Sequence, residues 1–259
     1  MSPNIKSFQR HVFRANVSGP SQRSWEFNGT DEAIVSTNTC TAIFDVAGPF
    51  DDGTNDYLFS VWFKPTDETP AAVQGIWGST SQTRNYHLNL MTDGKLRFSW
   101  TGPSGQADRR LESTSAVAVG WNHTAIRFHN DGGAGWDAKM WLNGSLDGTR
   151  AAASPYITTQ WTAHPFSIGR SGGSYFTGKI SQFALFGGSV FTDNQCAAFY
   201  GLGPSTNLVA TVSQPFFYLR GRSDDDLAAA GGVLNSGSST EVFSGVNMTT
   251  AANLTTDIA

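Results

Sequence analysis

The acidic residues are the first side chains in this sequence that could do chemistry. Hydrolysis of a glycosidic bond with retention needs two carboxyl groups that face each other across that bond. A strand supplies such groups when acidic residues stand two positions apart, because side chains alternate between its faces. The glutamates of this chain are isolated instead, at Glu26, Glu32, Glu68, Glu112 and Glu241. We therefore predict that the chain is not an enzyme that cleaves glycans.

A serine stands in a sequence of the form Gly-x-Ser-x-Gly, over residues 169–173. In hydrolases of that pattern, the nucleophilic serine lies on a sharp turn between a strand and a helix. Here an alternating strand pattern follows, from Phe176 onward. We therefore interpret residues 169–173 as a glycine-rich hairpin loop and do not assign Ser171 a catalytic role.

The acidic turn over residues 51–56 is a candidate metal site. Calcium binds several oxygen ligands, and Asp51, Asp52 and Asp56 could supply three carboxylates. Asp and Asn also favour turns without any metal, and we favour that interpretation. No cofactor is predicted, with calcium as the open alternative. The histidines within predicted strands are interpreted as packed or solvated residues rather than ligands: His87, His123 and His129.

Two large aromatic residues stand inside glycine-rich loops, and these are the candidate binding residues. Trp136 and Tyr175 could stack on sugar rings, while Asp131 and Asn143 could bind sugar hydroxyl groups. The alternative is that both rings pack onto the fold or into a contact between subunits. The sequence leaves both interpretations open.

The elements that must position these residues are short strands. Alternation over residues 57–65 predicts that Tyr57 and Phe59 face one way and Leu58 the other. Asp93-Gly94 and Asn143-Gly144 predict tight hairpin turns between such runs. This pattern favours an all-β fold, a two-sheet antiparallel jelly-roll sandwich. The predicted core side chains are Phe59, Val61, Phe63, Ile126, Phe128, Ile168, Ile180 and Phe183.

One helix is predicted, beginning at Thr192 or Asp193 and ending at Gly201 or Gly203. The chain divides into a basic arm over 1–22, a sandwich over 23–203, and a C-terminal extension with irregular strands over 204–259. We expect both outer segments to become ordered by contacts with other subunits. The acidic end of the extension and the basic arm are complementary, so a neighbour's arm is a predicted partner.

Composition limits the function classes. Of the 259 residues only 15% are charged and the net charge is −4, which argues against nucleic acid as a partner. We predict no signal peptide and no membrane segment, and hence assembly in a cytoplasm. Without a secretory route, Cys40 and Cys196 are expected to be free, buried thiols.

Several segments in order resemble laminin G-like, concanavalin A-like domains. They are SWEFNGTDEAIV, FSVWFKP, DGKLRFSW, MWLNGSLDGT and FSIGRSGGSYFTGKISQFALF followed by TDNQCAAFY, covering roughly residues 24–203. The resemblance implies a jelly-roll sandwich. Members often carry an acidic pair after the Gly-x-Ile of the last strand, and here Ser181 and Gln182 stand in its place.

The C-terminal segment resembles the extensions of such domains in bacteriophage structural proteins. That resemblance implies a non-enzymatic virion protein, such as a head decoration, spike or fibre component. It would be a homo-oligomer that contacts other capsid or tail proteins, located in the virion. The alternative is a glycan-binding adhesin that recognises a host-surface polysaccharide.

Overall fold

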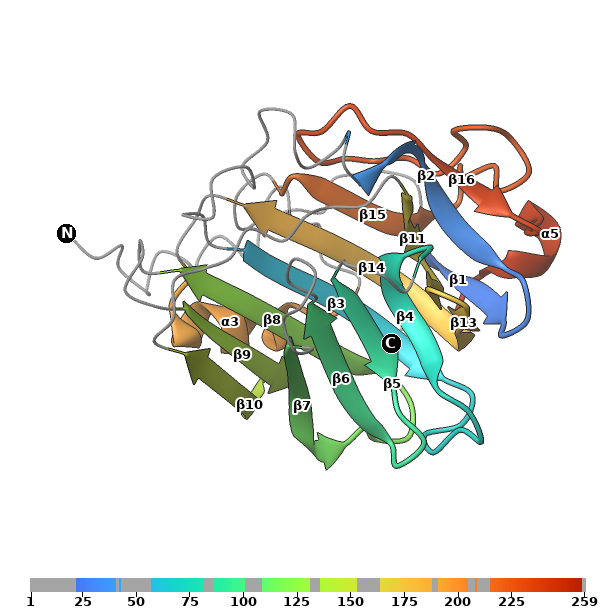
Figure 1. Cartoon of the computed structure of the whole chain (residues 1–259). Coiled ribbons are helices and arrows are strands. Elements are labelled where there is room, and N and C mark those ends of the chain that lie inside the picture. Colours follow the sequence, from blue (N-terminus) through green and yellow to red (C-terminus); the bar gives the residue numbers. More distant parts are fainter. Residues whose placement is uncertain are drawn as a thin grey trace.

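In the computed structural model of this chain, the alternating segments form two antiparallel sheets that pack face to face (Figure 1). The structure describes residues 22–40, 42, 57–81, 86–100, 109–130, 136–152, 164–187, 191–204, 208 and 215–257. Within that part of the chain the first sheet has eight strands. In spatial order they are β10 (Ser145–Ala152), β9 (Trp136–Leu142), β8 (Asn122–Asn130), β3 (Tyr57–Pro65), β14 (Thr177–Gly187), β15 (Phe217–Arg222), β1 (Gln22–Asn28) and β17 (Leu254–Thr255).

The second sheet has seven strands among the described residues. In spatial order they are β16 (Phe243–Val246), β2 (Ala33–Thr39), β11 (Pro165–Ile168), β4 (Gln74–Ser79), β5 (His87–Leu90), β6 (Lys95–Trp100) and β7 (Arg109–Ala116). A two-stranded hairpin, β12 (Arg170–Ser171) and β13 (Ser174–Tyr175), leads from β11 into β14. The predicted two-sheet jelly-roll sandwich is therefore confirmed.

The core lies between the two sheets and follows the alternation of β3. Tyr57 and Phe59 point into the sandwich, where Phe59 stacks on Trp77 of β4 with ring centroids 4.6 Å apart. Leu58 points out of it, into a second apolar cluster. All eight predicted core side chains are buried. Burial of each one stabilises the fold by about 1.5–3 kcal/mol.

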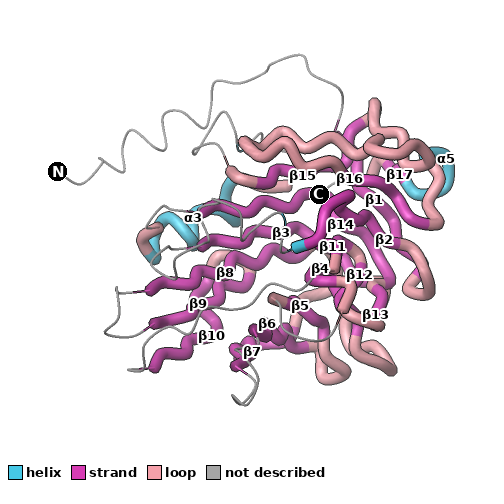
Figure 2. Tube along the Cα trace, turned by 45° about the horizontal axis from the view of Figure 1, so that its top comes forward, coloured by secondary structure: helices cyan, strands magenta, loops and turns pink. Residues whose placement is uncertain are grey.

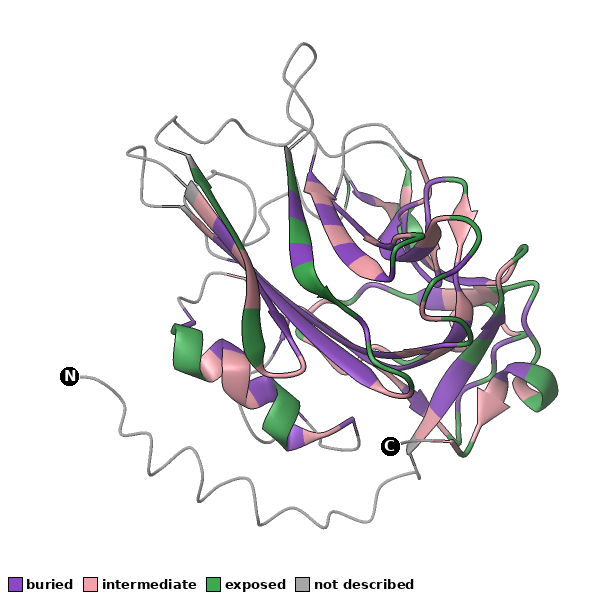
Figure 3. Cartoon of the chain, turned by 90° about the horizontal axis from the view of Figure 1, so that it is seen from below, coloured by how far each residue is buried: buried purple, intermediate pink, exposed green. Residues whose placement is uncertain are grey.

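The second cluster is covered by the helix α3 (Asp193–Leu202), which lies along the outer face of the first sheet (Figure 3). Phe199 of the helix packs edge-on against Phe186 of β14, with ring centroids 5.6 Å apart. Thr192 caps the helix start and Gly203 the end, as predicted. Cys196 lies in this cluster, and both it and Cys40 are buried thiols that form no disulfide among the described residues, as expected.

The C-terminal segment is part of the sandwich. β15 pairs with β14 and β1, β16 pairs with β2, and β17 pairs with β1, as Figure 2 shows together with the short helix α5 (Thr250–Asn253). The expectation that other subunits order this segment is wrong for residues 215–257, because its apolar side chains enter the chain's own core. Phe217 and Leu219 join the main core and Tyr218 the second cluster.

Charged groups also tie this segment to the sandwich. Asp257 accepts hydrogen bonds from Lys64 and Lys179 at 3.0 and 3.1 Å, so its partners are sandwich lysines. Buried Asp225 accepts from the indole nitrogen of Trp25 at 3.1 Å and from the backbone N–H of Arg222 at 3.0 Å. Burial raises the pKa of Asp225 to about 6. Of the predicted basic arm over 1–22, residues 1–21 lie outside the described residues, and Gln22 is the first residue of β1.

Candidate functional site

Two of the four residues predicted to bind sugar, Asn143 and Trp136, lie at opposite ends of β9. Asn143 lies in the turn after β9, where its side-chain oxygen accepts from the backbone N–H of His123 at 2.8 Å. Trp136 is the first residue of β9, at the other end of this seven-residue strand. At ~3.3 Å per residue, the two Cα atoms are roughly 23 Å apart. Asp131 lies outside the described residues, so its part in the prediction stays untested.

The side chain of Asn143 makes its hydrogen bonds within its own turn. Its side-chain nitrogen donates to Asn122 at 3.1 Å, and both Asn143 and Gly144 have positive φ angles, 50° and 81°. This is the backbone of the tight hairpin turn that the Asn-Gly pair predicts. The side chain therefore stabilises the turn.

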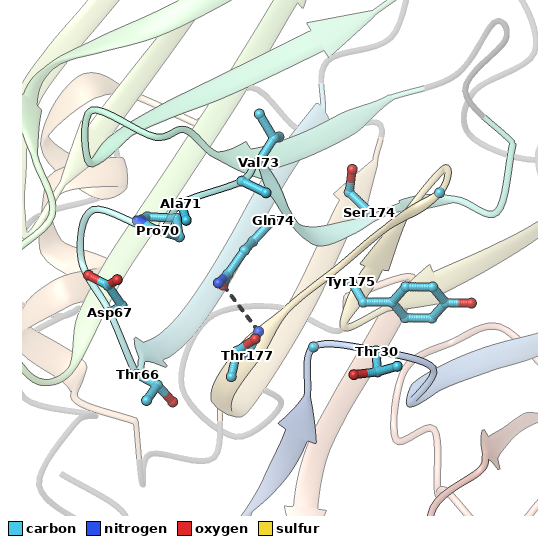
Figure 4. A pocket seen from close by; sticks show the side chains of 13 residues that line it. Thr30, Thr66, Asp67, Pro70, Ala71, Val73, Gln74, Ser174, Tyr175 and Thr177 are labelled. Carbon is cyan, nitrogen blue, oxygen red and sulfur yellow. Dashed lines mark hydrogen bonds between the residues drawn. The ribbon is translucent and has the colours of Figure 1, made fainter.

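Tyr175 lines an open cleft of about 710 Å³ at one end of the sandwich. Three segments surround the cleft: the β1–β2 turn with Gly29 and Thr30, the β3–β4 loop over 66–73 with Gln74 at the start of β4, and the β12–β13 hairpin. In Figure 4 Tyr175 and Thr30 lie toward one end of the cleft, with Asp67 and Thr66 toward the other. The cleft is therefore built from loops that are far apart in the sequence.

Thr177, the first residue of β14, joins these segments. Its backbone N–H donates to the side-chain oxygen of Gln74 at 3.1 Å, and its carbonyl accepts from the backbone N–H of Thr66 at 3.1 Å. Gly29 packs directly on the Thr177 side chain and has φ 79°, so a larger residue there would both collide and be strained. The floor of the cleft is thus fixed by one strand end.

The hairpin that carries Tyr175 lies against the outer face of β4. The backbones touch at Gly75, where a Cβ atom would come within 2.6 Å of Ser174 and 2.3 Å of Ser171. Arg170 donates to the carbonyl of Gly172 at 2.7 Å, and its guanidinium lies 5.0 Å from the centroid of the Tyr175 ring. This stacking holds the ring on one side and leaves Tyr175 half-buried.

Polar atoms surround the ring. Asp67 is exposed, and one of its carboxylate oxygens accepts from the backbone N–H of Thr69 at 2.9 Å. The hydroxyl groups of Thr30, Thr66 and Ser174 belong to the same lining. An aromatic ring beside hydroxyl, amide and carboxylate groups can stack on a sugar and exchange hydrogen bonds with its hydroxyl groups. Sequence reasoning identified Tyr175 but missed Asp67, Gln74 and Thr30.

Ser171 forms a hydrogen bond with a histidine of the second sheet, at 2.8 Å from Nδ1 of His87. A serine and a histidine so placed can act as nucleophile and base. Both side chains are buried, however, with 4% and 5% of their surface exposed, and burial lowers the pKa of His87 to about 4. The predicted glycine-rich hairpin at this position is confirmed, and the bond fastens it to β5.

The metal prediction stays untested. Asp51, Asp52 and Asp56 lie outside the described residues. Within the part of the chain that the structure describes, no three His, Cys, Asp or Glu side chains gather into a metal-binding group. Over the same residues, no helix has the length and apolar character needed to cross a membrane.

The sandwich, the helix on one outer face and the loop-lined cleft define a lectin-like jelly roll. The chain belongs to the concanavalin A-like lectin/glucanases superfamily, whose family model matches residues 28–195. This confirms the family resemblance predicted from the strand segments. No curated protein matches the sequence significantly.

Solved structures with the same fold include the CBM40 of Ruminococcus gnavus IT-sialidase, which has a TM-score of 0.51 and 16% identity over 69% of this chain and 98% of that chain. The same CBM40 bound to alpha2,3 sialyllactose has a TM-score of 0.50 and 17% identity over the same shares. The leech intramolecular trans-sialidase has a TM-score of 0.50 and 14% identity, over 71% of this chain and 28% of that enzyme. At these identities the likeness concerns the fold.

Proposed function

We propose that this chain is a glycan-binding protein and that the cleft beside Tyr175 holds the sugar. The observation that carries the proposal is the half-buried Tyr175 ring in an open cleft of about 710 Å³ with hydroxyl, amide and carboxylate groups around it. A jelly roll of similar fold, the Ruminococcus gnavus CBM40, is solved with alpha2,3 sialyllactose, which supports this function class. Glycan binding was the alternative in the sequence analysis and is now the leading hypothesis.

The test is a glycan array probed with the full chain and with Tyr175→Ala. We expect affinity for the bound glycans to fall at least about ten-fold, because the stacking surface is lost. Tyr175→Phe keeps the ring and should retain most of the binding. Tyr200→Ala is the matched control, since Tyr200 is an exposed tyrosine on α3. Trp136→Ala tests the other aromatic residue from the sequence prediction, and loss of binding only in that variant would move the site to β9.

The proposed activity is binding without bond cleavage. It rests on the isolated glutamates and on the burial of Ser171 and His87, which keeps this pair from a substrate in the cleft. The glycan that binds most tightly on the array should therefore be recovered intact after long incubation with the chain. Turnover that disappears on mutation of one residue would contradict this part of the proposal.

Presentation of this module on a bacteriophage particle, as a homo-oligomer among capsid or tail proteins, stays a proposal. It rests on the resemblance of the C-terminal segment and on the low charged fraction of the chain. Mass spectrometry of purified particles tests it directly. Absence of the chain from the particles would leave a glycan-binding protein with another location.

A further inference from the structure

We infer that the cleft selects neutral glycans and disfavours sugars that carry a carboxylate or sulfate; this inference rests on the proposed glycan-binding function. It comes from the charges around Tyr175. Among the described residues that line the cleft, Asp67 is the one with a formal charge at neutral pH, and none of them is Lys, Arg or His. Recognition of an anionic sugar usually depends on a cationic donor, most often a forked arginine.

The cations that flank the lining segments already have hydrogen-bond or ion-pair partners outside the lining. Arg170 donates to the backbone carbonyls of Gly172 and Thr80, at 2.7 and 3.5 Å, and neither residue lines the cleft. The same guanidinium stacks on Tyr175 at 5.0 Å from the ring centroid, so it occupies one face of the ring. A sugar would therefore stack on the other face.

The two lysines nearest the lining in the sequence are also paired. Lys64, two positions before Thr66, lies 3.0 Å from a carboxylate oxygen of Asp257. Lys179, two positions after Thr177, lies 3.1 Å from the same oxygen. Glu26 lies 3.7 Å from Lys179 as well, so two carboxylates balance the charge of the two lysines, which does not turn the cleft into an anion site.

Asp67 instead provides an acceptor suited to hydroxyl groups. One of its oxygens accepts from the backbone N–H of Thr69, and an ionised carboxylate has room for several more hydrogen bonds. Neutral sugars present pairs of hydroxyl donors that such a carboxylate can accept. An acidic sugar in the same place would put two negative charges within several ångström, which should lower its affinity about ten-fold relative to its neutral parent.

The experiment compares matched pairs of glycans on one array, each pair differing only by an acidic group, with lactose and alpha2,3-sialyllactose as one such pair. For the unmodified chain we expect the neutral member to bind about ten-fold more tightly. Asp67→Asn should reduce the ratio of affinities between the neutral and the acidic member of each pair at least about three-fold, because the repulsion by Asp67 is removed. Glu68→Gln removes the same charge from the same loop, but Glu68 is not among the lining residues. This variant should leave the affinity ratio within each pair unchanged.

The outcomes separate this inference from the proposed function. Tighter binding of the acidic members, lost in Tyr175→Ala, would overturn the charge preference and keep glycan binding at the cleft. An affinity ratio between neutral and acidic members that is the same in Asp67→Asn would also overturn the inference. No binding to any glycan, or binding that survives in Tyr175→Ala, would overturn both. Neutral preference that depends on Tyr175 and narrows in Asp67→Asn supports both.

Discussion

Tyr175 differs from Asn143, another predicted sugar contact, in how its side chain is placed. Both polar atoms of the Asn143 side chain form hydrogen bonds around its own turn. The Tyr175 ring, in contrast, is stacked on one face by Arg170 and lines an open cleft. Residue type alone cannot separate these two cases. Both residues stand in glycine-rich hairpin segments, and only the fold shows which hydrogen bonds are already made.

Buried His87 should make stability depend on pH. Burial lowers its pKa from 6.5 to about 4, so between these values the unfolded chain binds more protons than the folded chain. The contribution is complete above pH 6.5 and is lost as the pH falls toward 4, by up to about 3 kcal/mol. His87→Gln should flatten this part of the curve of unfolding free energy against pH, measured by urea denaturation. His164→Gln, at an exposed position, is the control, and an equal slope in both variants would contradict the assignment.

At the scale of elements, the C-terminal segment is fastened by one buried carboxylate. Asp225 accepts hydrogen bonds from Trp25 of β1 and from the backbone N–H groups of Arg222 and Leu234. Asp225→Ala leaves these donors without their acceptor inside the fold, so we expect a loss of about 2–4 kcal/mol in unfolding free energy. Asp224→Ala, which removes an exposed partner of Arg222, should cost less than about 1 kcal/mol. Equal losses of unfolding free energy in the two variants, measured by thermal or urea denaturation, would contradict the proposed role of Asp225 in holding the C-terminal segment.

Local patterns were enough to predict many elements. The alternation of β3, the Asn143-Gly144 turn and the capped helix α3 depend on neighbours in the sequence, and the structure confirms all three. The sequence pattern did not place β15 in either sheet. Its six residues, Phe-Tyr-Leu-Arg-Gly-Arg, do not alternate between apolar and polar, and the first three are buried on both faces of the strand. Such a strand looks like any short apolar run.

The cleft could be predicted only in part, for a related reason. The loop over 66–73 has the sequence of an ordinary polar connection between β3 and β4. The end of this loop meets the start of β14 through the bond between Gln74 and Thr177, two residues about a hundred positions apart in the sequence. No local pattern encodes such a pairing, so the sequence indicated Tyr175 without the residues that face it.

For the whole molecule, the two terminal segments should behave differently on deletion. Removal of residues 215–259 takes out β15, β16 and β17 and exposes the apolar edges of β14 and β2, so we expect an aggregated or unfolded product. Removal of residues 1–21 should leave a chain with a cooperative thermal transition, because β1 begins at Gln22. Circular dichroism and size-exclusion chromatography of both products test this. A folded monomer without residues 215–259 would contradict the role of these strands.

The N-terminal deletion also tests the predicted role of the basic arm. If the arm binds a neighbouring subunit, the shortened chain should fold but fail to join its assembly. That loss should resemble the effect of raised salt on the full chain, because screening weakens attraction between charged segments. Assembly that is unaffected by the deletion would show that the arm is a solvated tail.

The close backbone contact at Gly75 has a consequence for the energetics of recognition. Because the hairpin touches β4 with no side chain between them, the wall that carries Tyr175 has the stiffness of the sheet beneath it. A ligand entering the cleft need not immobilise a mobile loop, and the entropy usually lost in ordering such a loop is already accounted for in folding. The same rigidity limits adaptation, so sugars of a different outline meet a fixed surface. If the cleft holds a glycan as proposed, its shape discrimination depends on Gly75, which lies outside the lining.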